Sequence, residues 1–345
     1  MTLLAFLFAC TGGGSATTEP PAAAPKELHV YIWTNYHSED VVKRFEEKCA
    51  CKVILDTYDN NEVIEQKLQA GGVAYDIVVP SDYMVLSLSE QGLLTELDEA
   101  KLPGLPHLDP KLDWQKTSGA KRTGVPYLWG TAGLAYDTTQ VTGVVDSWSV
   151  VFDPKNKNRV VLLDDMREVF AIALKSAGKS VNDADEADLA AALTKLKAQK
   201  PLVLAYDSSD FAGKLQGGDA WVAHGYSGEL ASAARESGGK LKYIVPKEGA
   251  TLAVDNLAIP KSAKEPELAY QFIEFMLDPD NAAETTNATG YATANKDALP
   301  KIKPELANDP AVFPPPEVLA NCEMIKDLGE ATPKLDAMWT ELKAF

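Results

Sequence analysis

Leu28-His29-Val30-Tyr31-Ile32 is the first of three short β-rich runs whose alternation with helical patterns decides the fold. Ser38 can cap a helix after this run, and Lys52-Val53-Ile54-Leu55 follows as a second strand. A further helical pattern leads to a third strand at Tyr75-Asp76-Ile77-Val78-Val79, which Pro80 ends. Strands that alternate with helices are typical of βαβ units, so we expect a parallel sheet.

The same alternation begins again after the region from Gly130 to Gly133. The apparent strands of this second series are residues 160–163, 202–205, 221–223 and 241–245, and helical patterns near 167–174, 187–198 and 230–235 separate them. The chain has 345 residues, of which 46% are hydrophobic, enough for a sizeable core. Two similar sheets in series therefore predict an α/β protein with two lobes and a ligand crevice between them.

The charge of the chain argues against nucleic acid as a partner. Lys and Arg total 33 against 50 Asp and Glu, which gives a formal net charge of -17. Such a field repels phosphate backbones and anionic lipid headgroups, whereas it weakly favours cationic ligands.

The N-terminus has the pattern of a targeting segment. Residues 1–9 hold an apolar run too short to span a bilayer, and Leu7-Phe8-Ala9-Cys10 resembles a bacterial lipobox, in which Cys10 becomes lipidated after cleavage. Residues 10–26 are rich in Gly, Ser, Thr, Ala and Pro and suit a flexible tether. No Lys or Arg precedes the apolar run, so an incidental cysteine in a disordered tail is the alternative.

Three cysteines remain after Cys10, namely Cys49, Cys51 and Cys322. Outside the cytoplasm a disulfide is permitted. On an extended segment, Cys49 and Cys51 would sit near the upper limit of disulfide Cα separation. Either cysteine could instead pair with Cys322, or all three could be small buried thiols. The sequence does not decide between these alternatives.

Polar and aromatic side chains follow the ends of the predicted strands. In open parallel sheets, ligands bind beyond these carboxyl ends, where loops and helix N-termini converge. Taken singly, each residue is more often structural, since Ser81 or Asp165 can cap a helix and Trp33 can be a core aromatic. Together they can enclose a slender cation between rings and carboxylates. The candidates are Trp33, Thr34, Tyr36, Ser81, Tyr83, Asp165, Glu168, residues 206–209 and residues 226–229.

Signals of catalysis and of metal binding are scarce. Gly225-Tyr226-Ser227-Gly228 has its second glycine one residue too early for a nucleophile elbow. The four histidines are scattered, and the stretch from Asp278 lacks the glycine of a calcium loop. There is no phosphate-binding glycine motif. We therefore expect no enzyme, no metal and no cofactor.

Seven segments together carry a family resemblance. These segments occur in the same order as in the bacterial spermidine/putrescine-binding proteins of ABC importers. The chain resembles this family over nearly all of residues 27–345. These segments are Tyr31–Tyr36, Tyr75–Ser81, Val125–Gly130, Arg167–Phe170, Pro246–Gly249, Asp255–Pro260 and Gly290–Asn295.

The resemblance implies a two-lobed periplasmic-binding fold of type II-like architecture. Lobe one would comprise residues 27–131 and 255–300, and lobe two residues 132–254 and 301–345. It also implies a monomer that binds a polyamine-like cation such as putrescine or spermidine, without cofactor, and delivers it to the permease of an ABC importer. The protein would work in the periplasmic space or cell envelope, and only its lipid anchor would touch the membrane.

The resemblance also assigns roles to individual residues. Trp33 and Tyr36 match an aromatic wall, Ser81 and Tyr83 a hydrogen-bonding turn, and Asp165 and Glu168 carboxylates that face one amine. Asp255 matches the partner of an ammonium group near the hinge, and Tyr291 a further aromatic contact. Tyr226 and Glu229 align with a Trp and an acid of putrescine-preferring members, and Ser208 with a polar contact.

Four departures from the family pattern bear on the ligand. Ala253 stands where these receptors usually place a Trp or Phe, and loss of a cation–π wall costs about 0.5–2 kcal/mol. His224 replaces a Trp of spermidine-preferring members, Asn35 a carboxylate and Ile325 a Gln. These changes imply a wider pocket or a ligand with one bulkier end.

Two other classes of protein remain as alternatives. An enzyme on the same scaffold would need a nucleophile or base in the crevice. A sensory lipoprotein would bind ligand but signal to a partner. An anionic ligand is disfavoured, because Glu168, Glu229 and Asp255 would repel it.

Overall fold

We describe a computed structural model of the protein, which covers residues 25–71 and 74–345. The predicted signal segment, Cys10 and nearly all of the predicted tether lie outside the described residues. Among the residues described, no helix has the length and apolar character needed to cross a membrane.

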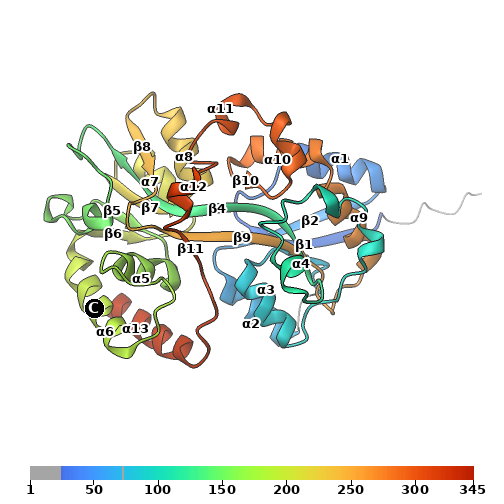
Figure 1. The fold of residues 1–345 in the computed structure, drawn as a ribbon, viewed down its shortest axis with the longest axis horizontal. Helices are drawn as coiled ribbons and strands as arrows, with labels where there is room; N and C mark the ends of the chain where they lie inside the picture. Colours follow the sequence, from blue (N-terminus) through green and yellow to red (C-terminus); the bar gives the residue numbers. More distant parts are fainter. Residues whose placement is uncertain (1–24, 72–73) are drawn as a thin grey trace, which may run out of the picture.

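Eleven strands form one continuous mixed sheet in the described part of the chain (Figure 1). The main path runs β2-β1-β3-β9-β4-β7-β5-β6, with β8 and β10 paired to β4 and β11 paired to β9. The strands are β1 (Glu27–Trp33), β2 (Lys52–Tyr58), β3 (Ile77–Val78), β4 (Gly124–Asp137), β5 (Val160–Leu162), β6 (Val203–Tyr206), β7 (Val222–Tyr226), β8 (Leu241–Ile244), β9 (Thr251–Ala258), β10 (Ala292–Thr293) and β11 (Glu323–Met324).

Helices flank both halves of this sheet (Figure 1). The predicted cap of the first helix is confirmed, since the Ser38 hydroxyl accepts a hydrogen bond from the Val41 amide. The helices are α1 (Glu39–Cys49), α2 (Asn61–Ala70), α3 (Asp82–Glu90), α4 (Trp114–Ser118), α5 (Met166–Lys175), α6 (Glu186–Gln199), α7 (Phe211–Gln216), α8 (Ser227–Glu236), α9 (Pro266–Met276), α10 (Pro279–Thr289), α11 (Pro304–Ala307), α12 (Pro316–Leu319) and α13 (Thr332–Ala344).

The sheet corrects the expectation of purely parallel pairing. Strands β1, β2 and β3 are parallel, as are β5, β6 and β7, but the long strands β4 and β9 run antiparallel between these two sets. The first half of β4 pairs with β9, and its second half pairs with β7. Two neighbouring antiparallel strands therefore join the lobes.

Gly130 to Gly133, after which the second series of strands and helices begins, lie inside the long strand β4. Glycine often breaks a strand, but here it permits close packing. A Cβ atom at Gly133 would lie 2.4 Å from the carbonyl oxygen of Ile244. The glycine thus allows β8 to approach β4 closely.

Each lobe has its own hydrophobic core. In the first lobe, Val30 and Ile77 pack with Phe45 of α1 and Phe272 of α9, whose ring centroids are 5.0 Å apart. In the second lobe, Phe170 of α5, Leu196 of α6 and Trp339 of α13 belong to one buried cluster. Residues 302–312 pack against α10 and β10 in a further cluster. These separate cores hold two firm bodies on either side of the β4–β9 connection.

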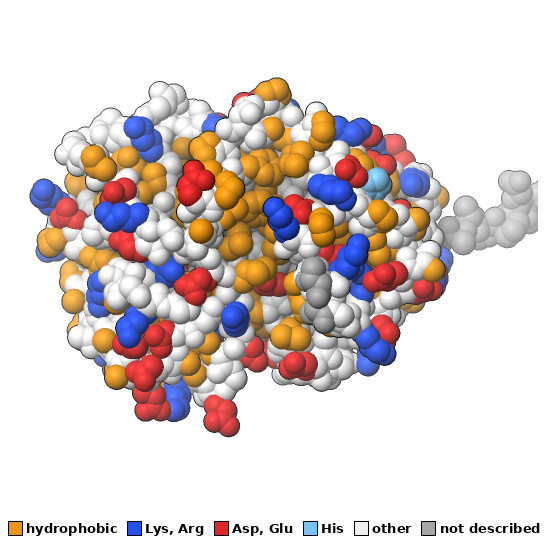
Figure 2. All heavy atoms as spheres, viewed as in Figure 1, with side chains coloured by type: hydrophobic (Ala, Val, Ile, Leu, Met, Phe, Trp, Pro, Cys, Tyr) orange, Lys and Arg blue, Asp and Glu red, His pale blue; other side chains and the backbone are white. Residues whose placement is uncertain are grey.

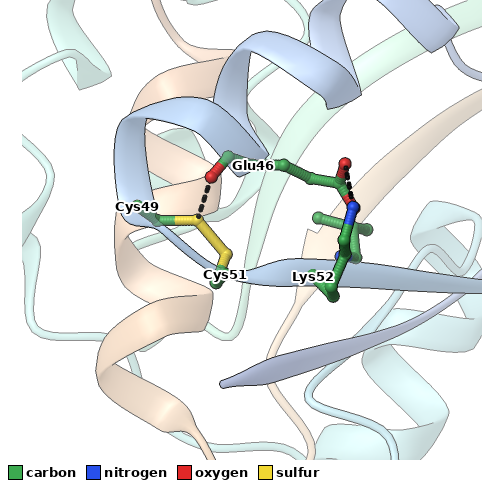
Figure 3. The surroundings of a disulfide bond; sticks show 5 residues. Glu46, Cys49, Cys51 and Lys52 are labelled. Carbon is green, nitrogen blue, oxygen red and sulfur yellow. Dashed lines mark hydrogen bonds and ion pairs between the residues drawn. A yellow bond between two sulfur atoms is a disulfide. The ribbon is translucent and has the colours of Figure 1, made fainter. Parts of the chain in front are cut away.

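Cys49 and Cys51 form a disulfide at the junction of α1 and β2 (Figure 3). The segment is not extended, because Ala50 adopts a left-handed conformation with φ 52° and brings the two Cα atoms to 5.2 Å. Cys322 is half-buried and free. Pairing with Cys322 and three reduced thiols, the two alternatives left open by the sequence, are both wrong.

The disulfide closes a loop of three residues, so we expect little stability from it. Chain entropy predicts that replacing both cysteines by alanine lowers the free energy of unfolding by no more than about 1.6 kcal/mol. Urea unfolding of Cys49→Ala/Cys51→Ala beside Cys322→Ala measures this. A loss above about 4 kcal/mol in the double variant alone would mean that the bridge holds α1 against β2 in some further way.

Candidate functional site

A cavity of ligand size lies between the two lobes. Its volume is about 800 Å³ including the solvent at its mouth, within the usual range of ligand sites. Figure 2 shows hydrophobic side chains gathered along the middle of this face, while charged side chains are spread over the outer surfaces. The structure brings all twelve predicted ligand residues to this cavity, namely Trp33, Thr34, Tyr36, Ser81, Tyr83, Asp165, Glu168, Ser208, Tyr226, Glu229, Asp255 and Tyr291.

Strand direction explains why residues so far apart in the sequence meet. Trp33 ends β1, Tyr226 ends β7 and Ser81 follows β3 by three residues. The parallel strands of each lobe direct their carboxyl ends toward the cleft, where the lobes face one another. The rule of strand ends is therefore obeyed in both lobes, although the complete sheet is mixed.

Asp255 is an acid of the cavity that two hydroxyl groups hold in place. It lies in β9, and its two carboxylate oxygens accept hydrogen bonds of 2.6 Å from the hydroxyls of Tyr36 and Ser81. Asn61 in turn donates to the Ser81 hydroxyl at 3.1 Å. Burial raises the pKa of Asp255 to about 6, and the two hydroxyl donors oppose that rise. The carboxylate is thus held in place with no basic partner.

Asp165 and Glu168 form an acidic pair at the N-terminus of α5 and line the same cavity. Asp165 caps this helix by accepting from the amides of Arg167 and Glu168. The Glu168 carboxylate is buried and accepts from the Thr251 hydroxyl at 2.8 and 2.9 Å. Burial, and then the charges of Glu62 and Glu168, raise the pKa of Asp165 well above its usual range. Asp165 therefore caps α5, as the sequence suggested, and also lines the cavity.

Glu229 and Asp59 make direct contacts between the lobes. Asn35 donates to Glu229 at 2.9 Å, and the Ser209 hydroxyl donates to Asp59 at 3.2 Å. Burial raises the pKa of Glu229 to about 7, while the Asn35 hydrogen bond lowers it. Asn35 therefore orients the Glu229 carboxylate by a hydrogen bond, although Asn35 itself does not line the cavity.

Aromatic rings build the walls between these acids. Trp33 lies 4.6 Å from Tyr58 and 6.2 Å from Tyr226, measured between ring centroids, and its indole nitrogen donates to the Val79 carbonyl. Tyr36 and Tyr291 form a second pair at 4.6 Å. Ser208 accepts from the Asp164 amide, which fixes the loop after β6. These contacts fix the orientation of the rings in the cavity wall.

Sequence reasoning missed several lining residues. The second strand was predicted to end at Leu55 but continues to Tyr58, so Tyr58 and Asp59 were not recognised at a strand end. Asp82 stands between two predicted residues and was overlooked. The others are Asn61, Gly130, Thr131 and Leu252; Ala253 and Ile325, noted as departures, also line the cavity.

The lining has a clear chemical character. It contains six carboxyl groups and six aromatic rings, but no Lys, Arg or His among its described residues. An anionic ligand would meet uncompensated repulsion, whereas a cation with an apolar body gains charge-assisted hydrogen bonds and cation–π contacts. Within residues 25–71 and 74–345, no cluster of three or more His, Cys, Asp or Glu side chains is arranged to hold a metal ion.

Comparison with known proteins agrees with this geometry. Residues 40–314 match the family described as bacterial extracellular solute-binding protein. The chain belongs to this family. Among curated proteins it is similar to the putrescine/cadaverine-binding protein of Pseudomonas aeruginosa, with 39% identity over 93% of this chain and 95% of that protein.

Solved structures of this solute-binding family give the same result. A Listeria monocytogenes protein described as a spermidine/putrescine ABC transporter has a TM-score of 0.88 and 36% identity, over 92% of this chain and 99% of that one. The TpPotD lipoprotein of Treponema pallidum has a TM-score of 0.81 and 29% identity, over 92% and 99%. The predicted two-lobed α/β solute-binding fold is confirmed.

Asp82 tests whether burying a carboxylate in this cavity lowers the stability of the folded protein. Burial, and to a smaller degree Asp255, raise the pKa of Asp82 to about 7. Since this value lies above the unfolded one of about 3.9, the folded state binds the extra proton, and stability is lost as pH rises from about 4 through 7. The Tyr83 amide donates a hydrogen bond to the Asp82 carboxylate at 2.9 Å, and the side-chain oxygen of Asp82→Asn can still accept it.

We therefore expect Asp82→Asn to be more stable than the native protein at pH 8 by on the order of 2–4 kcal/mol, with no difference near pH 4. Urea unfolding of ligand-free protein across this range measures the effect. Asp280→Asn, at an exposed ion pair with Lys301, is the matched control and should show no such trend. A constant difference at every pH would contradict the charge explanation.

Proposed function

We propose that this protein captures a small organic cation of the polyamine class and delivers it to an ABC importer. The observation that carries the proposal is the cavity itself, in which six carboxyl groups face rigid aromatic walls and no lining side chain supplies a positive charge. The names of the relatives from Pseudomonas aeruginosa and Listeria monocytogenes support the same ligand class.

The two acidic ends of the cavity suit a ligand with two separated amines. One ammonium group binds Asp255, which Tyr36 and Ser81 already orient. The other binds between Asp165 and Glu168. The methylene chain between the amines lies against Trp33 and its neighbouring rings, where apolar burial and cation–π attraction both contribute.

Ligand capture couples to closure of the lobes. We assign residues 27–131 and 255–300 to lobe one, and residues 132–254 and 301–345 to lobe two, with the segment 302–312 lying against lobe one. A cation that binds acids of both lobes stabilises the closed form over the open one. The permease of the importer then recognises the closed form.

The protein works at the cell envelope, anchored through Cys10. The short apolar run before Cys10 supports this part of the proposal, as does the lipoprotein from Treponema pallidum that shares the fold. Mass spectrometry of the native N-terminus should find a lipid on Cys10, and an unmodified or uncleaved N-terminus would exclude the anchor.

The protein binds its ligand without transforming it. Among the hydrogen bonds of the described residues, no serine or cysteine side chain is paired with a histidine, as a nucleophile and its base would be. The acids of the cavity instead hold tyrosine, serine, threonine and asparagine donors, which is the arrangement of a receptor.

Binding of diamines tests the proposal directly. Thermal unfolding and calorimetry with putrescine, cadaverine and spermidine should show stabilisation of about 2.7 kcal/mol at a ligand concentration one hundred times Kd. Glutarate, an anion of similar length, should have no effect. X-ray scattering of the same samples should show a smaller radius of gyration with ligand than without it, because the ligand closes the lobes.

Asp255→Asn should weaken binding at least 30-fold, because loss of a desolvated charge partner costs about 2–5 kcal/mol. Glu267→Gln removes an exposed acid paired with Lys101 and is the control for net charge, so its affinity should equal that of the native protein. Indifference of the native protein to all three cations, or equal affinities in both variants, would reject the amine assignment.

A further inference from the structure

Asp59 is a half-buried acid of the cavity that the proposed binding of amines leaves unused. Its two carboxylate oxygens accept hydrogen bonds from opposite lobes. The Thr34 hydroxyl, which follows β1 in the first lobe, donates to Oδ1 at 3.0 Å. The Ser209 hydroxyl, which follows β6 in the second lobe, donates to Oδ2 at 3.2 Å. One side chain therefore connects strand ends of the two lobes directly.

Asp59 is held in position by contacts within the first lobe. The Thr34 amide donates to the Tyr58 carbonyl at 3.3 Å, so the ends of β1 and β2 stay together on one side of Asp59. On its other side, Asn60 caps α2 by accepting a hydrogen bond from the Val63 amide. With Oδ1 bound to Thr34, Oδ2 is left to accept a donor from the second lobe.

Ser209 is presented by a turn that is equally well fixed in the second lobe. The Asp207 carboxylate accepts from the amides of Ser209 and Asp210 at 2.9 and 3.0 Å, which is the local pattern of a capped turn. Lys214 of α7 forms an ion pair with Asp207 and fixes this carboxylate in turn. The donor and the acceptor of the bond between the lobes are thus each positioned by their own lobe.

The bond between Ser209 and Asp59 lies at the rim of the cavity. Asp59 lines the cavity, whereas Ser209 lines an outer groove of about 1000 Å³ including open solvent. The bond from Asn35 to Glu229 crosses the same boundary in the opposite direction, because here the first lobe supplies the donor. The charge of Asp59 acts on Glu229, so the two bonds are near one another. The lobes cannot separate at this rim without breaking both.

Resting on the proposed function, we propose that the hydrogen bond from Ser209 to Asp59 is a latch that holds the lobes closed and slows release of the ligand. The ligand enters the open form, in which the two residues are apart and the bond is absent. After closure, the ligand leaves only when the bond breaks. Ser209 is accordingly a positioning residue, which acts on the ligand through the arrangement of the lobes.

A latch of this kind affects the two rate constants of binding differently. Ser209→Ala removes the donor, and the exposed position of Ser209 tolerates the smaller side chain. The variant should release putrescine about 2- to 10-fold faster than the native protein, as expected for loss of one hydrogen bond. Its association rate constant should stay the same, because the ligand meets the open form. Stopped-flow fluorescence of the tryptophans at rising putrescine concentrations separates the two rate constants.

Two further variants act as controls. Ser209→Thr keeps the hydroxyl and should restore the native dissociation rate. In Ser180→Ala the lost hydroxyl is again exposed and bound to a carboxylate, that of Glu323, but both residues belong to the second lobe. This variant should release putrescine at the native rate. A native rate in Ser209→Ala, or an equal increase in Ser180→Ala, would overturn the latch.

A double-mutant cycle tests whether Ser209 acts through Asp59. Once Asp59→Ala has removed the acceptor, adding Ser209→Ala should not increase the dissociation rate further, since interacting residues do not contribute independently. Additive effects of the two substitutions would mean that Ser209 acts in another way, and the inference would be overturned while the proposed function stands. If the native protein binds no cation at all, the proposed function fails and the latch fails with it.

Discussion

Carboxyl groups are costly to bury unless a positive charge or several donors face them, and this cost governs the cleft. Asp82, Glu229 and Asp255 all have raised pKa values because burial disfavours their charged forms. Hydroxyl and amide donors from Tyr36, Ser81 and Asn35 reduce that penalty without removing it. The site is therefore built with a deficit of positive charge, which the cation proposed above would neutralise.

Contacts elsewhere in the structure hold the rings and acids of the cavity in position. The aromatic rings are fixed by contacts of their own, as when Trp33 donates to the Val79 carbonyl and Tyr36 packs against Tyr291. Each lobe also packs around a core of its own. Packing within each lobe fixes that lobe's part of the cavity wall, so a ligand that closes the lobes need not order the individual rings.

Much of this arrangement could be predicted from the sequence, for a definite reason. Hydrophobic runs located β1, β5 and β7, and the rule of strand ends then placed Trp33, Asp165 and Tyr226 in the cleft. Local patterns failed where long-range pairing decides the structure. Strand β4 is interrupted by glycines in the sequence, yet pairing with β9, β7 and β8 holds it as one strand of 14 residues. The Cys49–Cys51 bridge also depended on one residue, Ala50, whose left-handed backbone no periodicity reveals.

The pairing of β4 with β9 makes each lobe depend on chain that is synthesised much later. Gly124 pairs with Ala258, and Ala132 pairs with Thr251, so the sheet of the first lobe stays incomplete until the chain has been synthesised as far as Ala258. Contacts between such distant parts of a chain form slowly, because the entropy of a long loop must be lost first. A chain that ends before β9 would lack the strand that completes the sheet of the first lobe, so the two lobes reach their final structure together and not one after the other.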